Sequence, residues 1–281
     1  MAVKKDDLDK VREGLALCMV LTTCADGKGT PEEIREMTSI TMDEPEFREG
    51  DGVADAFLNV ADGAKVDAKK LLDKVRKLLS TREQRLRGLQ LVSRVRTADV
   101  SFTEDDRNLL ERMAEDLGLT LDDVDDCLYG AQRRRARFLM IYLVYLTAMK
   151  DGMVRPQEFE SMIPLVLTQP IFNGVGTEDF AALSHSVRRH MDMAKLSPGA
   201  HPPAMEQSAA MLVNIAKSLD DETLGEQALK VIARGLFADG EAHPSDRGFF
   251  LKIAHKFKLL DQAAHRVMDD AINDARQRAK N

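Results

Sequence analysis

The chain repeats one pattern four times: an apolar helical run ends in an acidic turn, and a second amphipathic run restarts behind a helix-start signal. The four turns begin at Asp26, Asp99, Asp151 and Asp239. After the turn, the first and third copies share one frame of apolar positions, and the second and fourth share another. This A-B-A-B order is typical of a duplicated two-repeat unit.

The junction of the duplication falls between Leu128 and Arg137. We therefore predict two tandem helical-bundle domains, residues 1–130 and 131–281, each built from two pseudo-symmetric helix-turn-helix repeats. Between the repeats, the periodicity predicts helices over residues 52–62, 66–79, 83–97, 179–194 and 204–218. Tryptophan is absent and aromatic residues make up only 5% of the chain, which suits packing of helices on helices. The predicted fold class is all-α.

Each turn is followed by a helix start with an acid at its third helical position. The N-cap slots hold Thr30, Thr103, Arg155 and His243, and the acids are Glu33, Asp106, Glu158 and Asp246. A carboxylate at this position can accept a hydrogen bond from the N–H of the N-cap residue, and its negative charge lies near the positive end of the helix dipole. Only Thr30 and Thr103 complete a capping box, because arginine and histidine are poor caps. Val100 stands where the other copies have glycine, so that turn is built differently.

The same acids are candidate metal ligands. When each copy is aligned with the twelve-residue calcium-binding loop of an EF-hand, the turn aspartate falls at position five and the following acid at position twelve. The aligned loop contains no acids before position five. If the A and B loops of one domain lie side by side, four carboxylates converge, and Ca²⁺ or another divalent cation could bind. Helix caps without metal explain the same pattern. The candidate ligands are Asp26, Glu33, Asp99, Asp106, Asp151, Glu158, Asp239 and Asp246.

An apolar helix that ends in Ala-Asp-Gly before an acidic helix start resembles the tellurite-resistance TerB family and the related N-terminal domain of membrane-anchored DjlA co-chaperones. Residues 24–27 with Glu33, and residues 237–240 with Asp246, carry the resemblance most clearly. It implies compact bundles with two pseudo-symmetric halves, here in tandem. It also implies a bacterial cytosolic protein of stress or tellurite response that acts through protein partners, including membrane-associated ones, with metal as a further option.

Charge and composition limit the other function classes. The net charge of −7 argues against nucleic-acid binding, which demands a basic face. Residues 133–137 (Arg-Arg-Arg-Ala-Arg) form the one basic cluster, which we interpret as a solvated junction rather than a lipid contact. The helix that follows, over residues 138–149, has no polar stripe and is expected to be buried. Three cysteines without a CxxC pair favour a reducing, cytoplasmic setting.

The sequence thus favours a non-enzymatic protein that works by protein–protein interaction. It contains no HExxH, GxSxG or P-loop motif. Two alternatives stay open. One is an all-helical enzyme with a site between the two domains, and the other is a self-associating structural component. The second is suggested by uneven charge, because residues 1–130 hold 29 Asp or Glu against 20 Lys or Arg, whereas residues 131–281 hold 18 against 20.

Overall fold

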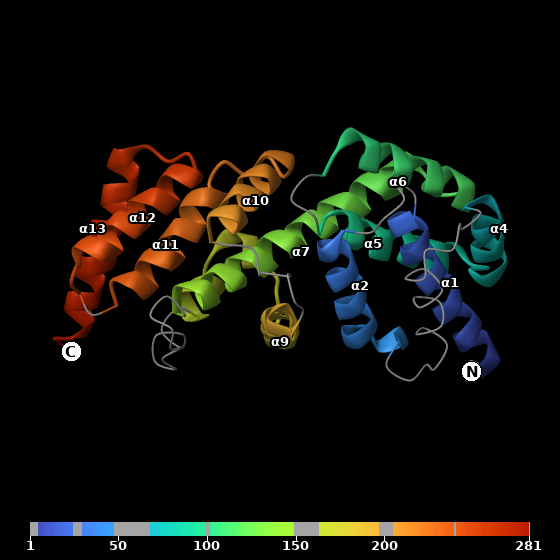
Figure 1. Ribbon diagram of the computed structural model, residues 1–281, viewed down its shortest axis with the longest axis horizontal. Coiled ribbons are helices and arrows are strands. Elements are labelled where there is room, and N and C mark those ends of the chain that lie inside the picture. The colour runs from blue at the N-terminus through green and yellow to red at the C-terminus, as the bar shows by residue number, and fades with distance from the viewer. Residues whose placement is uncertain are drawn as a thin grey trace. The chain divides into compact units, whose positions relative to one another are not determined.

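The computed structural model describes residues 5–24, 30–47, 68–98, 102–148, 163–196, 205–238 and 240–280 (Figure 1). Within these segments all regular elements are helices, which confirms the predicted all-α class. The helices fall into two compact units, Met1–Arg135 and Ala136–Asn281. No helix in the described segments combines the length and apolar character needed to cross a bilayer.

The first unit is organised around two helices that cross closely. Its elements are α1 (Lys5–Cys24), α2 (Pro31–Asp43), η1 (Pro45–Phe47), α4 (Ala68–Leu78), α5 (Arg82–Arg96), α6 (Glu104–Leu117) and the first part of α7 (Leu121–Ala148). Helix α1 packs on α4 and α5, and α5 also contacts α2 and α6. Gly88 permits the close crossing, since a Cβ there would lie 3.0 Å from the Cys18 sulfur.

The predicted helices of this unit are largely confirmed. Those expected over 66–79 and 83–97 correspond to α4 and α5, whereas the one over 52–62 lies outside the described residues. Cys18 and Cys127 are buried, as small core residues should be. Burial raises the pKa of the Cys18 thiol to about 12, so this sulfur stays protonated and unreactive at neutral pH.

Helix α7 runs unbroken from Leu121 to Ala148 through the predicted domain boundary at residue 130. Its second part is buried almost continuously, which confirms the expectation for the apolar run. Phe138 and Tyr142 are both less than 10% exposed and pack edge-on against the ring of His190. The aromatic contacts therefore fix this part of α7 inside the second unit.

The second unit ends in helices that are spaced like those at the end of the first. It contains η2 (Pro170–Phe172), α9 (Thr177–Leu196), α10 (Met205–Ser218), α11 (Leu224–Leu236), α12 (Pro244–Lys256) and α13 (Asp261–Arg278). Helix α11 lies against α10, α12 and α13. Helices α6 and α12 begin at residues 104 and 244, and α7 and α13 begin at 121 and 261, so both pairs are offset by 140 positions.

The buried positions of α6 and α12 are also offset by 140 residues. The matched core pairs are Leu110/Phe250, Met113/Ile253, Ala114/Ala254 and Leu117/Phe257, and each member is no more than 5% exposed. The ends of α6 and α12 match too. Gly118 has φ +69° and Lys258 has φ +59°, and both are followed by a leucine N–H that donates to an alanine carbonyl, Ala114 or Ala254. The two helices thus end in the same left-handed turn.

This turn gives a first prediction. A left-handed conformation costs a residue with a Cβ roughly 1–2 kcal/mol, and glycine avoids that cost. We expect Lys258→Gly to raise the free energy of unfolding by about 1 kcal/mol and Gly118→Ala to lower it by a similar amount. Urea unfolding followed by circular dichroism measures both. A lower stability of Lys258→Gly would contradict the equivalence of the two turns.

Candidate functional site

Two of the predicted acids act as helix caps. Thr30 Oγ1 accepts from the Glu33 N–H at 3.2 Å, and Glu33 Oε2 accepts from the Thr30 N–H at 2.8 Å. Thr103 and Asp106 form the same pair of bonds, at 3.3 and 2.7 Å. Both capping boxes are therefore confirmed. They satisfy the donors at the starts of α2 and α6 and place one oxygen of each carboxylate beside the backbone.

The remaining carboxylate oxygens meet at Arg96, the last residue of α5. One terminal nitrogen of its guanidinium contacts Glu33 Oε1 at 2.6 Å, and the other contacts Asp106 Oδ1. The first nitrogen also donates to the Thr22 carbonyl of α1 at 3.3 Å. The side chains of Arg96, Glu33 and Asp106 are only 10%, 2% and 6% exposed. We call these three residues the Arg96 triad.

The Arg96 triad joins the helix ends that flank the two turns of the first unit. Helices α1, α2, α5 and α6 all supply groups to it, so the A and B repeats are tied at their turns. The positive charge between the two carboxylates belongs to Arg96. A divalent cation at this point would have to replace the guanidinium or share its carboxylates. Sequence reasoning missed Arg96, although an arginine three positions before Asp99, near the end of the helix predicted over residues 83–97, was the available signal.

The other candidate ligands are only partly placed. Asp26, Asp99, Asp151, Glu158 and Asp239 lie outside the described residues. Asp246 is half-buried in the first turn of α12, where His243 makes no side-chain cap bond, as expected. Across the described segments, His, Cys, Asp and Glu form no cluster of three or more with metal-binding geometry.

An arginine from the last helix of each unit holds the B turn. Arg135 donates to the carbonyl of Ala98 at 2.7 Å, and Arg276 donates to the carbonyl of Gly240 at 2.8 Å. Gly240 has φ +79°, and a Cβ there would lie 2.9 Å from Arg276. The expectation that residues 133–137 are a solvated junction is thus wrong for Arg135, which is 7% exposed. A carbonyl of the turn compensates the burial of its charge.

A second ionic network joins α5 to α2 and η1. Arg87 contacts Glu44 at 2.6 Å and Glu46 at 2.8 Å, and Arg94 contacts Glu36 at 3.0 Å as well as Glu44. Burial by itself would raise the pKa of Glu36 and of Glu44, but the arginines reverse this. Arg94 is the largest favourable influence on both carboxylates, and their pKa values fall below the ordinary 4.5.

These lowered pKa values set a pH dependence. A carboxylate whose pKa is lower in the folded state than in the unfolded state stabilises the fold. This stabilisation is fully present at pH values above the pKa of the unfolded state, and it is lost as the pH falls through the pKa of the folded state. We expect the free energy of unfolding to drop below about pH 4.5. The drop should be smaller in Glu36→Gln/Glu44→Gln. Urea titrations at pH 7, 5, 4 and 3 measure this, with the surface variant Glu111→Gln as control. An equal drop in all three proteins would contradict the assignment.

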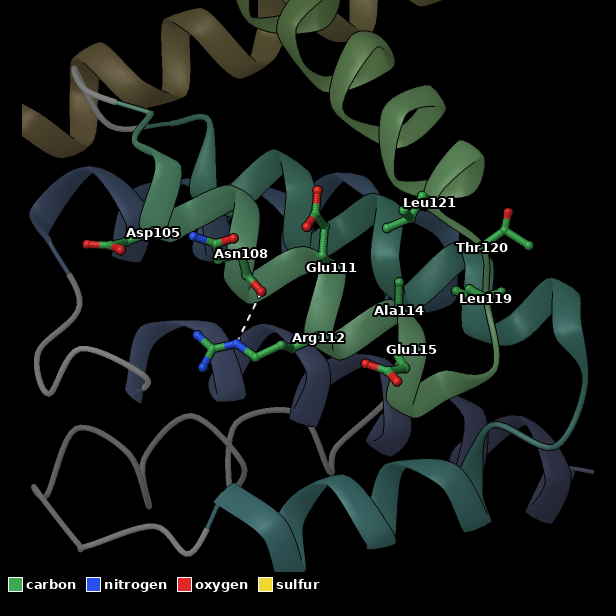
Figure 2. A pocket seen from close by; sticks show the side chains of 9 residues that line it. All are labelled: Asp105, Asn108, Glu111, Arg112, Ala114, Glu115, Leu119, Thr120 and Leu121. Carbon is green, nitrogen blue, oxygen red and sulfur yellow. Dashed lines mark hydrogen bonds between the residues drawn. The ribbon is translucent and has the colours of Figure 1, made fainter.

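An open hollow of about 820 Å³ lies along α6 and the turn into α7. Figure 2 shows the side chains that line it. Asp105, Glu111 and Glu115 line it with carboxylates, while Arg112 turns back to donate to the Asn108 carbonyl at 3.1 Å. Leu121 stands at its end and is 60% exposed. The described lining residues include no histidine, cysteine or serine, so any acid–base role at this hollow would fall to the carboxylates.

The fold and the Arg96 triad together define a class: a helical bundle in which paired helix-turn-helix repeats are joined at their turns by buried ion pairs. Residues 12–127 match the family model described as Tellurite resistance protein TerB. The match includes Glu33, Arg96 and Asp106, so this part of the chain is TerB-like. No curated protein and no solved structure matches the chain.

Proposed function

We propose that this tellurite-resistance-like protein is a non-enzymatic component of a cytoplasmic stress response and acts by binding a protein partner. The match of residues 12–127 to the TerB family carries this proposal. The arrangement of the polar groups supports it. In the first unit, the buried charges at the paired turns are engaged in joining helices, through Arg96, Glu33 and Asp106. Such a unit suits a rigid binding module.

We also propose that residues 136–281 contain a second TerB-like domain and that it differs from the first in cation binding. The position equivalent to Arg96 is Leu236, which has no charge. The corresponding carboxylates are present as Asp151, Glu158, Asp239 and Asp246. If these acids converge, their mutual repulsion would favour Ca²⁺ or another divalent cation, which prefers oxygen ligands. The first unit would then be cation-independent because Arg96 takes that role.

Thermal unfolding of the chelated protein with added Ca²⁺, Mg²⁺, Mn²⁺ or Zn²⁺ tests the cation proposal, since a ligand of the native state raises Tm. We expect a saturable shift with at least one ion. Asp239→Asn/Asp246→Asn should abolish the shift, whereas Glu33→Gln/Asp106→Asn should keep it even if its basal Tm is lower. Loss of the shift in the Glu33/Asp106 variant alone would place the cation in the first unit. No shift with any ion would overturn the cation proposal.

Growth of a tellurite-sensitive bacterial host that expresses the chain tests the main proposal. We expect growth at tellurite concentrations that stop the empty-vector strain, and crosslinking of a tagged chain in these cells should recover a defined protein partner from the cytosol or the membrane fraction. Arg96→Met, which disrupts the first unit, is the control and should lose both effects. Unchanged tellurite sensitivity would contradict the proposed role. Recovery of the chain alone would indicate self-association instead.

A further inference from the structure

The hollow along α6 combines negative charge with an exposed apolar side chain. Asp105 lies at one end, and Glu115 and Leu121 lie toward the other (Figure 2). The side chains of Asp105 and Glu115 are exposed and have neither a hydrogen bond nor an ion pair within the described segments. Carboxylates outnumber the single arginine of the lining by three to one. We call Asp105, Glu115 and Leu121, which is 60% exposed, the α6 surface.

The equivalent helix of the second unit has the opposite charge. Helix α6 carries six carboxylates and two arginines, whereas α12 carries one carboxylate and three lysine or arginine residues. Lys252 and Lys256 lie one turn apart near the end of α12, Lys258 lies in the turn that follows, and all three are exposed. Glu206 contacts Lys252 at 2.5 Å and also attracts Lys256, but Lys258 has no ion pair in this part of the chain. Positive charge therefore dominates here.

Leu260 follows these lysines and is poorly suited to its local position. It is the N-cap of α13, makes no side-chain cap bond and is 78% exposed. The equivalent residue of the first unit is Thr120, whose hydroxyl accepts from the Asp123 N–H at 3.2 Å. Leucine is among the poorest N-cap residues. A residue that weakens a helix start and exposes apolar area is expected where a contact with another molecule uses it.

We propose that the α6 surface of one copy of the chain binds the α12 surface of a second copy, made of Lys252, Lys256, Lys258 and Leu260. The carboxylates lie against the lysines, and Leu121 and Leu260 cover each other. Opposite charge favours this pairing, whereas like charge disfavours contact between two α6 surfaces. Because the contact joins two different surfaces, each pair leaves one of each free, and copies add head to tail. It does not depend on the proposed protein partner.

Mixing of two charge-reversed variants of the full chain tests this contact, with sedimentation velocity as the measurement. Asp105→Lys/Glu115→Lys changes the α6 surface, and Lys256→Glu/Lys258→Glu changes the α12 surface. We expect the wild type to associate as its concentration rises, and to do so less at 1 M salt, where the Debye length falls to about 3 Å. Each variant alone should stay monomeric. Their equimolar mixture should associate, because the unchanged α12 surface of the first fits the unchanged α6 surface of the second.

Two further variants separate this contact from general effects of charge and folding. Asp269→Lys/Asp270→Lys changes the net charge as much as the α6 variant does, at exposed positions more than two turns into α13, and should associate like the wild type. Leu260→Thr supplies a capping residue, so it should keep or raise Tm while it weakens association.

Circular dichroism shows whether each variant is folded. A wild type that stays monomeric at every concentration, a mixture that associates no more than its two components, or charge-reversed variants that associate like the wild type would each overturn the proposal. Unchanged association of Leu260→Thr would exclude Leu260 from the contact and contradict the pairing of the two leucines.

Discussion

Replacing Arg96 with methionine is expected to lower the free energy of unfolding by about 3–5 kcal/mol, because it leaves two buried carboxylates without their counter-ion. Glu33 is 2% exposed and Asp106 is 6% exposed, so water can replace the guanidinium only in part. Methionine fills much of the same space, which separates the lost charge from a cavity effect. Urea unfolding at neutral pH and low salt measures the change.

A surface arginine provides the matched control. Arg107 also contacts two carboxylates, Glu111 at 2.9 Å and Asp125 at 2.7 Å, but its side chain is 38% exposed. Exposed ion pairs contribute about 0–1 kcal/mol. Arg107→Met should therefore change stability far less than Arg96→Met, although both substitutions remove one arginine with two acidic partners.

The triple variant Arg96→Met/Glu33→Gln/Asp106→Asn separates the effect of unpaired charge from the effect of lost packing around Arg96. Replacement of a whole buried ionic cluster by neutral groups is often close to neutral, whereas removal of one member is not. We expect the triple variant to recover a large part of the stability that Arg96→Met loses. If Arg96→Met and the triple variant are equally unstable, unpaired charge is not the cause, and packing of the Arg96 stem would explain the loss.

The capping boxes show what local sequence predicts well. Thr30 with Glu33 and Thr103 with Asp106 are read from spacing alone, because the donor and acceptor lie within one turn of the same helix. Arg96 could not be assigned in this way. Its partners lie 63 and 10 positions away, so their meeting depends on how α2 and α6 pack against α5. Contacts between distant segments follow from packing, which a local pattern does not encode.

The basic run at residues 133–137 shows why composition alone wrongly predicted a solvated junction. A cluster of arginines on an acidic protein is usually solvated, but these residues continue α7, and successive positions on a helix face different directions. Arg133 therefore reaches the Tyr129 ring, Arg135 caps a turn, and Arg137 donates to the Ile171 carbonyl at 2.7 Å. A helix was predicted over residues 138–149, directly after this run, and its extension back through the run was the available signal.

The B repeats show how far the repeat pattern extends. Four pairs of apolar positions matched between copies two and four are buried in both units, and the helix starts keep the same offset. Polar details are not kept: Thr103 has a cap bond and His243 has none. Apolar periodicity therefore predicts the equivalent helices, whereas the chemistry of each turn has to be read copy by copy.

Leu110 and Phe250 occupy equivalent core positions, and both are fully buried. Truncation to alanine should cost about 2–5 kcal/mol for Leu110→Ala and about 3–5 kcal/mol for Phe250→Ala, from lost burial and the cavity that remains. The two variants also test the proposal of two tandem domains. If each unit unfolds on its own, each substitution destabilises one set of helices and leaves the other set unchanged.

Hydrogen exchange followed by mass spectrometry distinguishes the outcomes. We expect Leu110→Ala to reduce protection in α1, α5 and α6 and to leave α11, α12 and α13 as in the wild type, and Phe250→Ala to do the reverse. Helix α7 belongs to both units and should respond in its first part to one variant and in its second part to the other. Loss of protection across all helices in both variants would mean that the chain unfolds as one cooperative unit, and the tandem proposal would then be wrong.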